Sequence, residues 1–226
     1  MLMPVDTSRC RADANGLHGG LPRLRSRRGD DAARSSCASS ASAAIRTFAS
    51  ELFDTVHRAM ISTPRLLLRT FTLADVPKLF VMSIEEGMRR IPDQVYRDEQ
   101  HAEQVARALI AYTDLSPEPR TRPYVLGIEH AETRLLIGHV GLSAWRGSVE
   151  IGYAIEQQYQ GAGLATEAVA AMSDWGLSEL ALPEVLGIVT VDNAPSCRVL
   201  EKAGFVRTGE SVDGRANAVF IYRRAR

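Results

Sequence analysis

The sequence has few cysteines and none of the spacings that bind metals. Its 226 residues include only Cys10, Cys37 and Cys197, an odd number without a C-x-x-C pair. This usage suggests neither a disulfide framework nor a zinc–thiolate site. The five histidines form no H-x-x-x-H or H-E-x-x-H pattern, so we expect no bound metal. A reducing, cytoplasmic setting is the plain expectation.

The sequence also lacks a long apolar run and a net charge. No stretch reaches the eighteen or so apolar residues that a membrane-spanning helix needs, so we expect no membrane partner. The 27 basic residues balance 27 acidic ones, which argues against nucleic acid as an electrostatic partner. Residues 61–226 hold 18 basic and 21 acidic residues, and this slight acidity would favour a cationic partner.

Residues 1–60 differ in composition from the rest of the chain. They are rich in Arg, Ser, Ala and Gly and show little periodic hydrophobicity, so burial would not offset the entropy lost on ordering. We therefore expect a disordered extension, in which only residues 45–56 have the apolar spacing of a short amphipathic helix. An Arg- and Ser-rich targeting segment is one alternative. A chain that truly begins at Met60 is another.

Residues 61–226 alternate between strand-like and helix-like patterns. The expected strands are 65–69, 124–129, 135–142, 149–155, 185–191, 205–210 and 218–222. Helices are expected after Thr72, after Asp98, after Gly163 and from Pro195, and Thr72 with Asp75 has the spacing of a capping box. This order indicates a single α/β (α+β) domain, with a mixed, twisted sheet of about seven strands and flanking helices.

One stretch, EIGYAIEQQYQGAGLATEA from Glu150 to Ala168, orders a strand, a glycine-rich loop and a helix. Such an order aims several loop N–H groups at one point, to which the helix adds the positive end of its dipole. Gly161 and Gly163 let the backbone take positive φ and approach a ligand without an intervening Cβ. We expect this loop to bind an anion, most naturally a phosphate or pyrophosphate.

Two other phosphate loops fit this stretch poorly. The run from Gly161 to Thr166, GAGLAT, lacks the third glycine of a dinucleotide fingerprint, and no acidic residue ends the next strand at the required distance. No Gly-Lys-Ser/Thr follows either, which excludes a nucleoside-triphosphate loop. A glycine turn that only connects a strand to a helix is the plain alternative.

Three segments in order resemble one known family. The signature Q/R-x-x-G-x-G/A of the GNAT superfamily of acetyl-CoA-dependent N-acetyltransferases matches Gln158-Tyr159-Gln160-Gly161-Ala162-Gly163. Upstream, residues 63–69, TPRLLLR, resemble the first strand of its RimJ/RimL-like branch. Downstream, residues 193–205, NAPSCRVLEKAGF, resemble the branch's N-x-x-S-x-x-V-L-E-K-x-G-F segment. The likeness spans residues 62–224.

The resemblance implies acetyl-CoA as cosubstrate and a place for it. The fourth and fifth expected strands would splay apart, with the pyrophosphate on the loop and the pantetheine arm beside residues 151–153. A bulge at Ile151 or Gly152 would aim an N–H at the thioester oxygen. The expected cofactor-binding residues are Ile151, Gly152, Tyr153, Gln158, Tyr159, Gln160, Gly161, Ala162, Gly163, Leu164 and Asn193.

The resemblance also bears on the acid that serves the departing thiolate. Many family members carry a tyrosine seven residues after the asparagine that Asn193 matches, but Leu200 occupies that position here. Ser196 is therefore the candidate for stabilising or protonating the thiolate, and its alternative is an ordinary residue in the first turn of a helix. Asn193 itself would hydrogen-bond the pantetheine, cap the helix that starts near Pro195, or do both.

Glu150 is the candidate base, acting through water on the incoming ammonium, and a solvated carboxylate at a strand end is its alternative. Its parity along the strand places it opposite Ile151 and Tyr153. An α-amine with a pKa near 7.7–8.0 is roughly one-tenth neutral at pH 7, whereas a lysine near 10.4 is almost wholly charged. A weak base can therefore still serve N-terminal amines.

We therefore expect acetyl transfer to a primary amine, with a protein N-terminal α-amine as the leading acceptor. A small-molecule amine, such as an aminoglycoside, a polyamine or an amino acid, is the rival acceptor. A non-catalytic acyl-CoA-binding sensor is the rival class of protein. We expect the protein to be a monomer or a homodimer.

Overall fold

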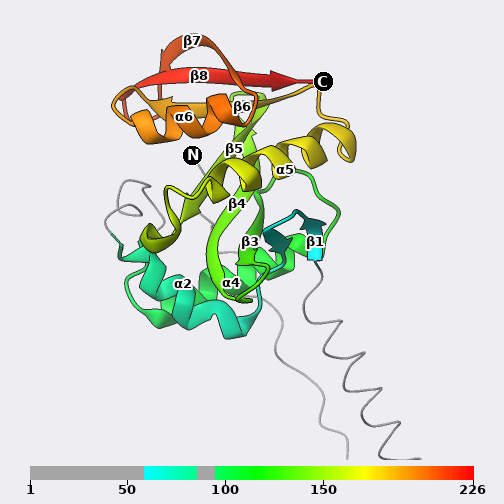
Figure 1. The fold of residues 1–226 in the computed structure, drawn as a ribbon, viewed down its shortest axis with the longest axis vertical. Helices are drawn as coiled ribbons and strands as arrows, with labels where there is room; N and C mark the ends of the chain where they lie inside the picture. Colours follow the sequence, from blue (N-terminus) through cyan, green and yellow to red (C-terminus); the bar gives the residue numbers. More distant parts are fainter. Residues whose placement is uncertain (1–58, 86–94) are drawn as a thin grey trace, which may run out of the picture. The chain divides into compact units, whose positions relative to one another are not determined.

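The computed structural model describes residues 59–85 and 95–226, which belong to one folded unit (Figure 1). The extension expected up to residue 60 lies outside these residues except for its last two, and the helix expected at 45–56 lies wholly outside them. Within the described residues, none of the helices has both the length and the apolar character needed to cross a bilayer.

An eight-stranded mixed sheet is the frame of this unit, in the order β1-β2-β3-β4-β5-β6-β8-β7. All neighbouring strands are antiparallel except β5 and β6, which are parallel. The strands are β1 Ala59–Ser62, β2 Leu66–Arg69, β3 Tyr124–His130, β4 Leu136–Trp145, β5 Ser148–Ile155, β6 Glu184–Thr190, β7 Val206–Val212 and β8 Ala218–Ala225. Seven correspond to the expected strands. The eighth, β1, was not expected, because it straddles the boundary drawn at residue 60 between the extension and the folded domain.

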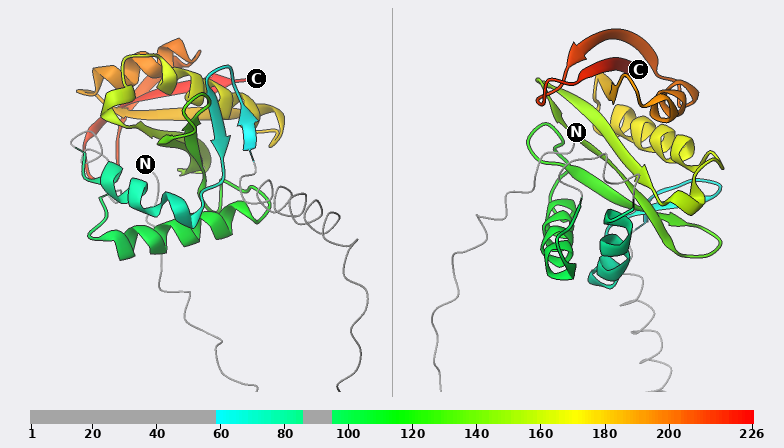
Figure 2. Two further views of the ribbon diagram at one scale, coloured as in Figure 1. Left: turned by 60° about the horizontal axis from the view of Figure 1, so that its bottom comes forward. Right: turned by 90° about the vertical axis from the view of Figure 1, so that its left-hand side faces the viewer.

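Helices cover both faces of this sheet. They are α2 Val76–Ser83, α4 Glu99–Thr113, α5 Leu164–Ser178 and α6 Ala194–Lys202, with short 3-10 turns at Leu73–Asp75 and Gln157–Tyr159. Figure 2 shows α5 and α6 on one side of the sheet and α2 with α4 on the other. Two apolar clusters correspond to the two sides, the larger beneath α5 and the smaller beneath α2 and α4.

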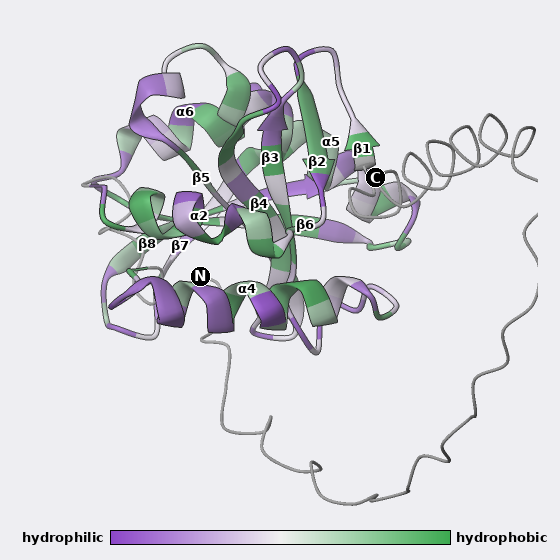
Figure 3. Cartoon of the chain, turned by 90° about the horizontal axis from the view of Figure 1, so that it is seen from below, coloured by the Kyte–Doolittle hydropathy of each residue, from purple (hydrophilic) through white to green (hydrophobic). Residues whose placement is uncertain are grey.

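Helix α4 shows how the local sequence sets an element of this fold. Asp98 precedes its first turn, and its carboxylate accepts a hydrogen bond from the His101 N–H at 2.7 Å, as an N-cap does. Ala102, Ala106 and Leu109 are buried at i, i+4 and i+7, and Figure 3 shows the matching apolar and polar sectors along the helix. The spacing of apolar residues therefore decides which side of α4 meets the sheet.

The two faces of the central strands carry different side chains. The α5 face is apolar: Tyr124 of β3 stacks on Trp175 of α5 with ring centroids 5.0 Å apart, and Leu142 of β4 contacts the backbone of α5 at Gly176. Side chains alternate along a strand, so cross-strand partners share a face. The other face therefore carries the register pairs His139–Ala154, Gly141–Gly152 and Ser143–Glu150.

Strands β5 and β6 part from each other. They share one registered pair, Glu150 with Leu186, whereas every other neighbouring pair of strands shares at least three. The expected splay between these strands is therefore present, with Glu150 at its apex. The expected bulge at Ile151 or Gly152 is wrong for the ladder with β4, because that register runs unbroken from Ser148 to Ile155.

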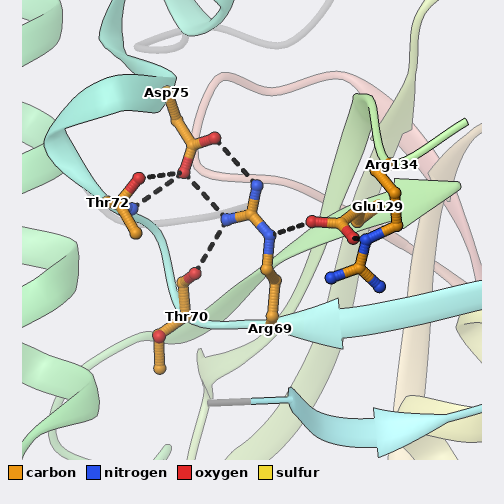
Figure 4. A network of polar contacts seen from close by, with 6 residues as sticks. All are labelled: Arg69, Thr70, Thr72, Asp75, Glu129 and Arg134. Atoms are coloured by element: carbon orange, nitrogen blue, oxygen red, sulfur yellow. Dashed lines mark hydrogen bonds and ion pairs between the residues drawn. The ribbon is translucent and has the colours of Figure 1, made fainter. Parts of the chain in front are cut away.

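A buried arginine ties the start of α2 to the sheet (Figure 4). Arg69 of β2 is 4% exposed and donates to both carboxylate oxygens of Asp75, at 2.8 and 2.9 Å, and to Glu129 of β3. Asp75 also accepts from the Thr72 N–H at 2.8 Å, which confirms the expected capping box. Burial opposes ionisation of Asp75, but the hydrogen bonds from Arg69 and Thr72 outweigh it and hold its pKa below the usual value.

Candidate active site

The glycine-rich loop ahead of α5 has the geometry of an anion nest. Gly161 and Gly163 have φ of 80° and 79°, and Gly163 is the N-cap of α5. Among the described residues, none accepts a hydrogen bond from the backbone N–H groups of residues 161–166, and the next donor, the Glu167 N–H, bonds to the Gly163 carbonyl. A Cβ on Gly161 would meet open space, so backbone conformation, not crowding, favours glycine there.

The other expected loop residues fall into two groups. Gln158, Gln160 and Ala162 are exposed beside the nest, and the Gln160 amide donates to the Ile155 carbonyl at 2.9 Å, which braces the loop against β5. Tyr159 is half-buried and packs against the larger apolar cluster, and Leu164 is 4% exposed within it. The side chains of Tyr159 and Leu164 therefore anchor the loop to the core.

Two residues of the β1–β2 turn, Thr63 and Arg65, hold this loop in place. The sequence alone assigned no role to this turn. The Arg65 guanidinium donates to the Glu167 carboxylate at 2.7 Å and to the Ala162 carbonyl at 2.9 Å. Thr63 Oγ1 donates to the same carboxylate at 2.6 Å. Burial opposes the charge on Glu167, but these hydrogen bonds keep its pKa below the usual value. Arg65 lies in the family-like segment TPRLLLR and Glu167 in the stretch from Glu150 to Ala168, but no local pattern joins the two.

Helix α6 brings Asn193 and Ser196 to the open side of the splay. Asn193 is the N-cap of α6, and its side-chain oxygen accepts from the Ser196 N–H at 3.3 Å, so the capping interpretation is confirmed. Ser196 is half-buried in the first turn. Its hydroxyl lies 2.6 Å from the hydroxyl of Tyr153, which reaches it from β5. Burial raises the pKa of Tyr153 to about 12, so this phenol is protonated at neutral pH.

Glu150 lies at the apex of the splay and is fully buried, at 0% exposure. The alternative of a solvated carboxylate is therefore wrong. Burial raises the pKa of Glu150 above its ordinary value, which makes its ionised form a better proton acceptor than a surface glutamate. Its side chain shares a face with Ser143, whereas Ile151 and Tyr153 lie on the α5 face, as their parity predicts.

Two further polar residues on the Glu150 face escaped the sequence analysis. Ser143 is 1% exposed and is the cross-strand partner of Glu150. His139 lies four residues before Ser143 on the same face of β4, where it pairs with Ala154 of β5. It is 9% exposed, and burial lowers its pKa to about 4. His139 is therefore neutral at pH 7. Gly141 and Gly152, a cross-strand pair, separate the two polar positions along this face.

The site therefore has two sides that meet where β5 leaves β6. The side facing α5 and α6 offers the anion nest and the two hydroxyls of Tyr153 and Ser196. The opposite side offers the buried carboxylate of Glu150. A group bound between the parted strands would have hydrogen-bond donors on one side and a proton acceptor on the other. This division suits acyl transfer, in which one proton leaves the nucleophile and another reaches the leaving group.

A splayed mixed sheet with a nest ahead of its central helix defines the class of protein as an acyltransferase of the CoA-dependent type. Residues 65–206 match the model of the family described as the acetyltransferase (GNAT) domain. The chain belongs to this family, whose members use acetyl-CoA as the acyl donor. Within residues 59–85 and 95–226, His, Cys, Asp and Glu side chains form no group of three placed to hold a metal ion.

Relatives and solved structures agree with this assignment. The uncharacterised N-acetyltransferase YnaD of Bacillus subtilis (strain 168) is 30% identical over 152 residues, which are 66% of this chain and 84% of that protein. The fold is similar to that of RimL, a ribosomal L7/L12 alpha-N-protein acetyltransferase in complex with coenzyme A, with a TM-score of 0.61, 16% identity and coverage of 72% and 95% of the two chains. It is also similar to a spermidine N-acetyltransferase chimera of SpeG from Vibrio cholerae and hSSAT, with a TM-score of 0.56, 21% identity and coverage of 71% and 95%.

Proposed function

We propose that this N-acetyltransferase belongs to the RimJ/RimL-like branch and transfers acetyl from acetyl-CoA to the α-amine of a protein N-terminus. The observation that carries the proposal is the position of Glu150, a fully buried carboxylate at the apex of the splay, on the face opposite Ser196. The amine would approach from the Glu150 face and the thiolate would leave toward α6.

The donor would bind along the α5 face. The amides of residues 161–166 would hold the pyrophosphate, and this anchor, remote from the reacting atom, would position the thioester. The pantetheine arm would lie along the β6-facing edge of β5, where the strands share no registered pair beyond Glu150, and would reach Asn193. Losing one hydrogen-bond donor to a thioester oxygen costs about 10²–10³ in rate. A backbone N–H on this edge that reached the thioester oxygen would therefore contribute strongly to catalysis.

The chemistry would then need three proton transfers. Glu150 would take one proton from the ammonium through water, the freed amine would attack the thioester carbon, and the nitrogen of the tetrahedral intermediate would release its second proton to water. Collapse of this intermediate would break the C–S bond, and the sulfur would take a proton from the Ser196 side. The product amide and the free thiol of CoA complete the balance.

The choice of acceptor follows from proton affinity. An α-amine has a pKa near 7.7–8.0, so a carboxylate whose pKa is raised by burial removes its proton far more readily than that of a lysine near 10.4. The net acidity of residues 61–226 agrees with a cationic acceptor. RimL, a structural neighbour, is named for an alpha-N-protein substrate, which supports the same choice. A polyamine is the second candidate, because another neighbour is named for spermidine.

Thiol release measures this activity directly. The full chain is incubated with acetyl-CoA and matched peptides, one with a free α-amine and a blocked lysine, the other with a blocked α-amine and a free lysine. Spermidine, an aminoglycoside and free amino acids complete the panel. We expect release above background hydrolysis with the free α-amine peptide, and much less with the lysine peptide. Preference for spermidine or another small amine would overturn the acceptor assignment.

A result in which no amine raises thiol release would overturn the enzymatic proposal itself. Calorimetric binding of CoA would then identify a sensor. In an active protein, Glu150→Gln should lower the rate near pH 7 by about 10²-fold or more, the usual range for a general base. Raising the pH through the pKa of the α-amine should recover part of this loss, because the amine then arrives neutral.

A further inference from the structure

Leu200 stands where many family members carry a tyrosine that acts as general acid. The structure shows why Leu200 has no chemical role. Its side chain is 1% exposed and packs on β6 at Gly187, where an added Cβ would come within 2.5 Å of Leu200 Cδ1. The space above Gly187 is therefore filled by this leucine. The acid for the thiolate must come from another residue.

The hydroxyl of Tyr153 contacts α6 one helical turn before Leu200. Ser196 precedes Leu200 by four residues, so the two lie on the same side of α6. The Tyr153 hydroxyl of β5 lies 2.6 Å from Ser196 Oγ and 3.3 Å from the Ser196 carbonyl oxygen. The contact joins residues 43 positions apart and crosses from one arm of the splay to the other.

We propose that Tyr153 is a positioning residue that acts through Ser196 in place of the missing tyrosine. The inference rests on the proposed function. In this relay the Tyr153 hydroxyl would donate to Ser196 Oγ, a direction that the 2.6 Å contact allows, and the hydrogen of Ser196 would then be directed at the departing sulfur. An aliphatic hydroxyl is a far weaker acid than a phenol, so Ser196 alone would be a poor proton source. The pair can give the sulfur a proton, and the negative charge that remains then lies on the phenol oxygen of Tyr153.

The proton transfers balance as follows. The C–S bond breaks with its electron pair on sulfur, the proton of Ser196 moves to that sulfur, and the proton of Tyr153 moves to Ser196 Oγ. The resulting tyrosinate regains a proton from water before the next turnover, since Tyr153 and Ser196 are only half-buried. Burial keeps Tyr153 protonated at the start of each cycle.

The test compares Tyr153→Phe, Ser196→Ala and the double variant, with amine and acetyl-CoA varied separately. Tyr153→Phe should lower kcat by about 10- to 100-fold, toward the lower end of general-acid effects. The KM for acetyl-CoA and the calorimetric affinity for CoA should stay near the wild-type values. Because the two hydroxyls act as a unit, the double variant should be no slower than the slower single one.

Cys197 provides the matched control, since it is the neighbour of Ser196 in α6 and is also half-buried. Cys197→Ala should keep the wild-type kcat. Tyr153→Phe or Ser196→Ala with wild-type kcat would overturn the relay, and so would additive losses in the double variant or a loss confined to CoA affinity. If Tyr153→Phe fails to fold, Tyr153→Leu takes its place, because it also removes the hydroxyl that meets Ser196. A wild-type protein inactive on every amine would instead refute the proposed function.

Discussion

Two arginines in the segment TPRLLLR, Arg65 and Arg69, have opposite environments although they lie four residues apart. The side chain of Arg69 is 5% exposed and is held by two carboxylates, one in the turn before α2 and one in β3. The side chain of Arg65 is 47% exposed and is held by Glu167 of α5 and the carbonyl of Ala162. One arginine joins elements of the fold, and the other aligns a loop.

Burial, not the type of ion pair, decides what each arginine contributes. A buried pair is costly to break, because the remaining partner keeps its charge without solvent. An exposed pair is screened by water and contributes little to stability, although it can still fix the direction of a loop. We therefore expect stability to depend on Arg69 and CoA binding to depend on Arg65.

The largest expected effect is on stability, for Arg69→Met. It would leave Asp75 and Glu129 buried without this partner and should lower the free energy of unfolding by about 3–5 kcal/mol. Denaturant unfolding followed by circular dichroism measures the change. Arg134→Ala is the control, because Arg134 contacts the same Glu129 but is 60% exposed, and it should cost less than about 1 kcal/mol. Equal losses in the two variants would refute the role of burial.

The next effect is on CoA binding, for Gly163→Ala. A residue with a Cβ at φ 79° costs about 1–2 kcal/mol, so the nest should lose its binding geometry and the Kd for CoA should rise about 5- to 30-fold. Calorimetric titration measures the Kd. Gly209→Ala is the control, since Gly209 has open space around it and no left-handed φ. An unchanged Kd in Gly163→Ala would mean that the loop does not hold the diphosphate.

Arg65→Ala should separate stability from CoA binding most clearly. The free energy of unfolding should fall by less than about 1 kcal/mol, because the pair is exposed. The Kd for CoA should nevertheless rise several-fold, because the loop loses its contact at the Ala162 carbonyl. Arg65→Lys keeps the charge without the two-sided contact and should be intermediate. A stability loss as large as that of Arg69→Met would show that burial does not decide what the two arginines contribute.

The smallest effect concerns pH and Glu150, whose pKa is raised by burial where that of Asp75 is lowered. A raised pKa means that folding favours the neutral form, so ionised Glu150 weakens the fold as pH rises above the unfolded value near 4.3. Glu150→Gln should therefore gain thermal stability over the wild type near pH 7–8 and lose this advantage near pH 4. A difference in Tm that does not change with pH would contradict the burial of this charge.

Much of the fold was predictable because it depends on neighbours in the sequence. Seven strands, the helix after Asp98 and the capping box of Thr72 with Asp75 follow from periodicity and from side chains that bond three residues away. The glycine loop follows likewise, because φ near 80° at Gly161 and Gly163 is a local property. Strand β1 escaped prediction because half of it lies in the Arg- and Ser-rich stretch that composition assigned to the extension.

The candidate site was only partly predictable. Its loop, Asn193, Ser196 and Glu150 stood out through spacing and resemblance, whereas no local pattern assigned roles to Arg65 and Ser143. The contact of Tyr153 with Ser196 spans 43 residues, and that of Arg65 with Glu167 spans 102. The sequence alone also placed a bulge in β5, where the ladder with β4 is unbroken. Contacts at such separations depend on how strands are ordered in the sheet.

By itself, the sequence determined the alternation of strands and helices, the glycine-rich loop and the family, because each rests on local periodicity or on short motifs. Only the tertiary structure decided that Arg69 is buried while Arg65 is exposed, that Glu150 is enclosed at the apex of a splay, and that a tyrosine from β5 meets a serine from α6. The physical reason is that burial and long-range hydrogen bonds are properties of packed elements, which only the assembled sheet and helices bring together.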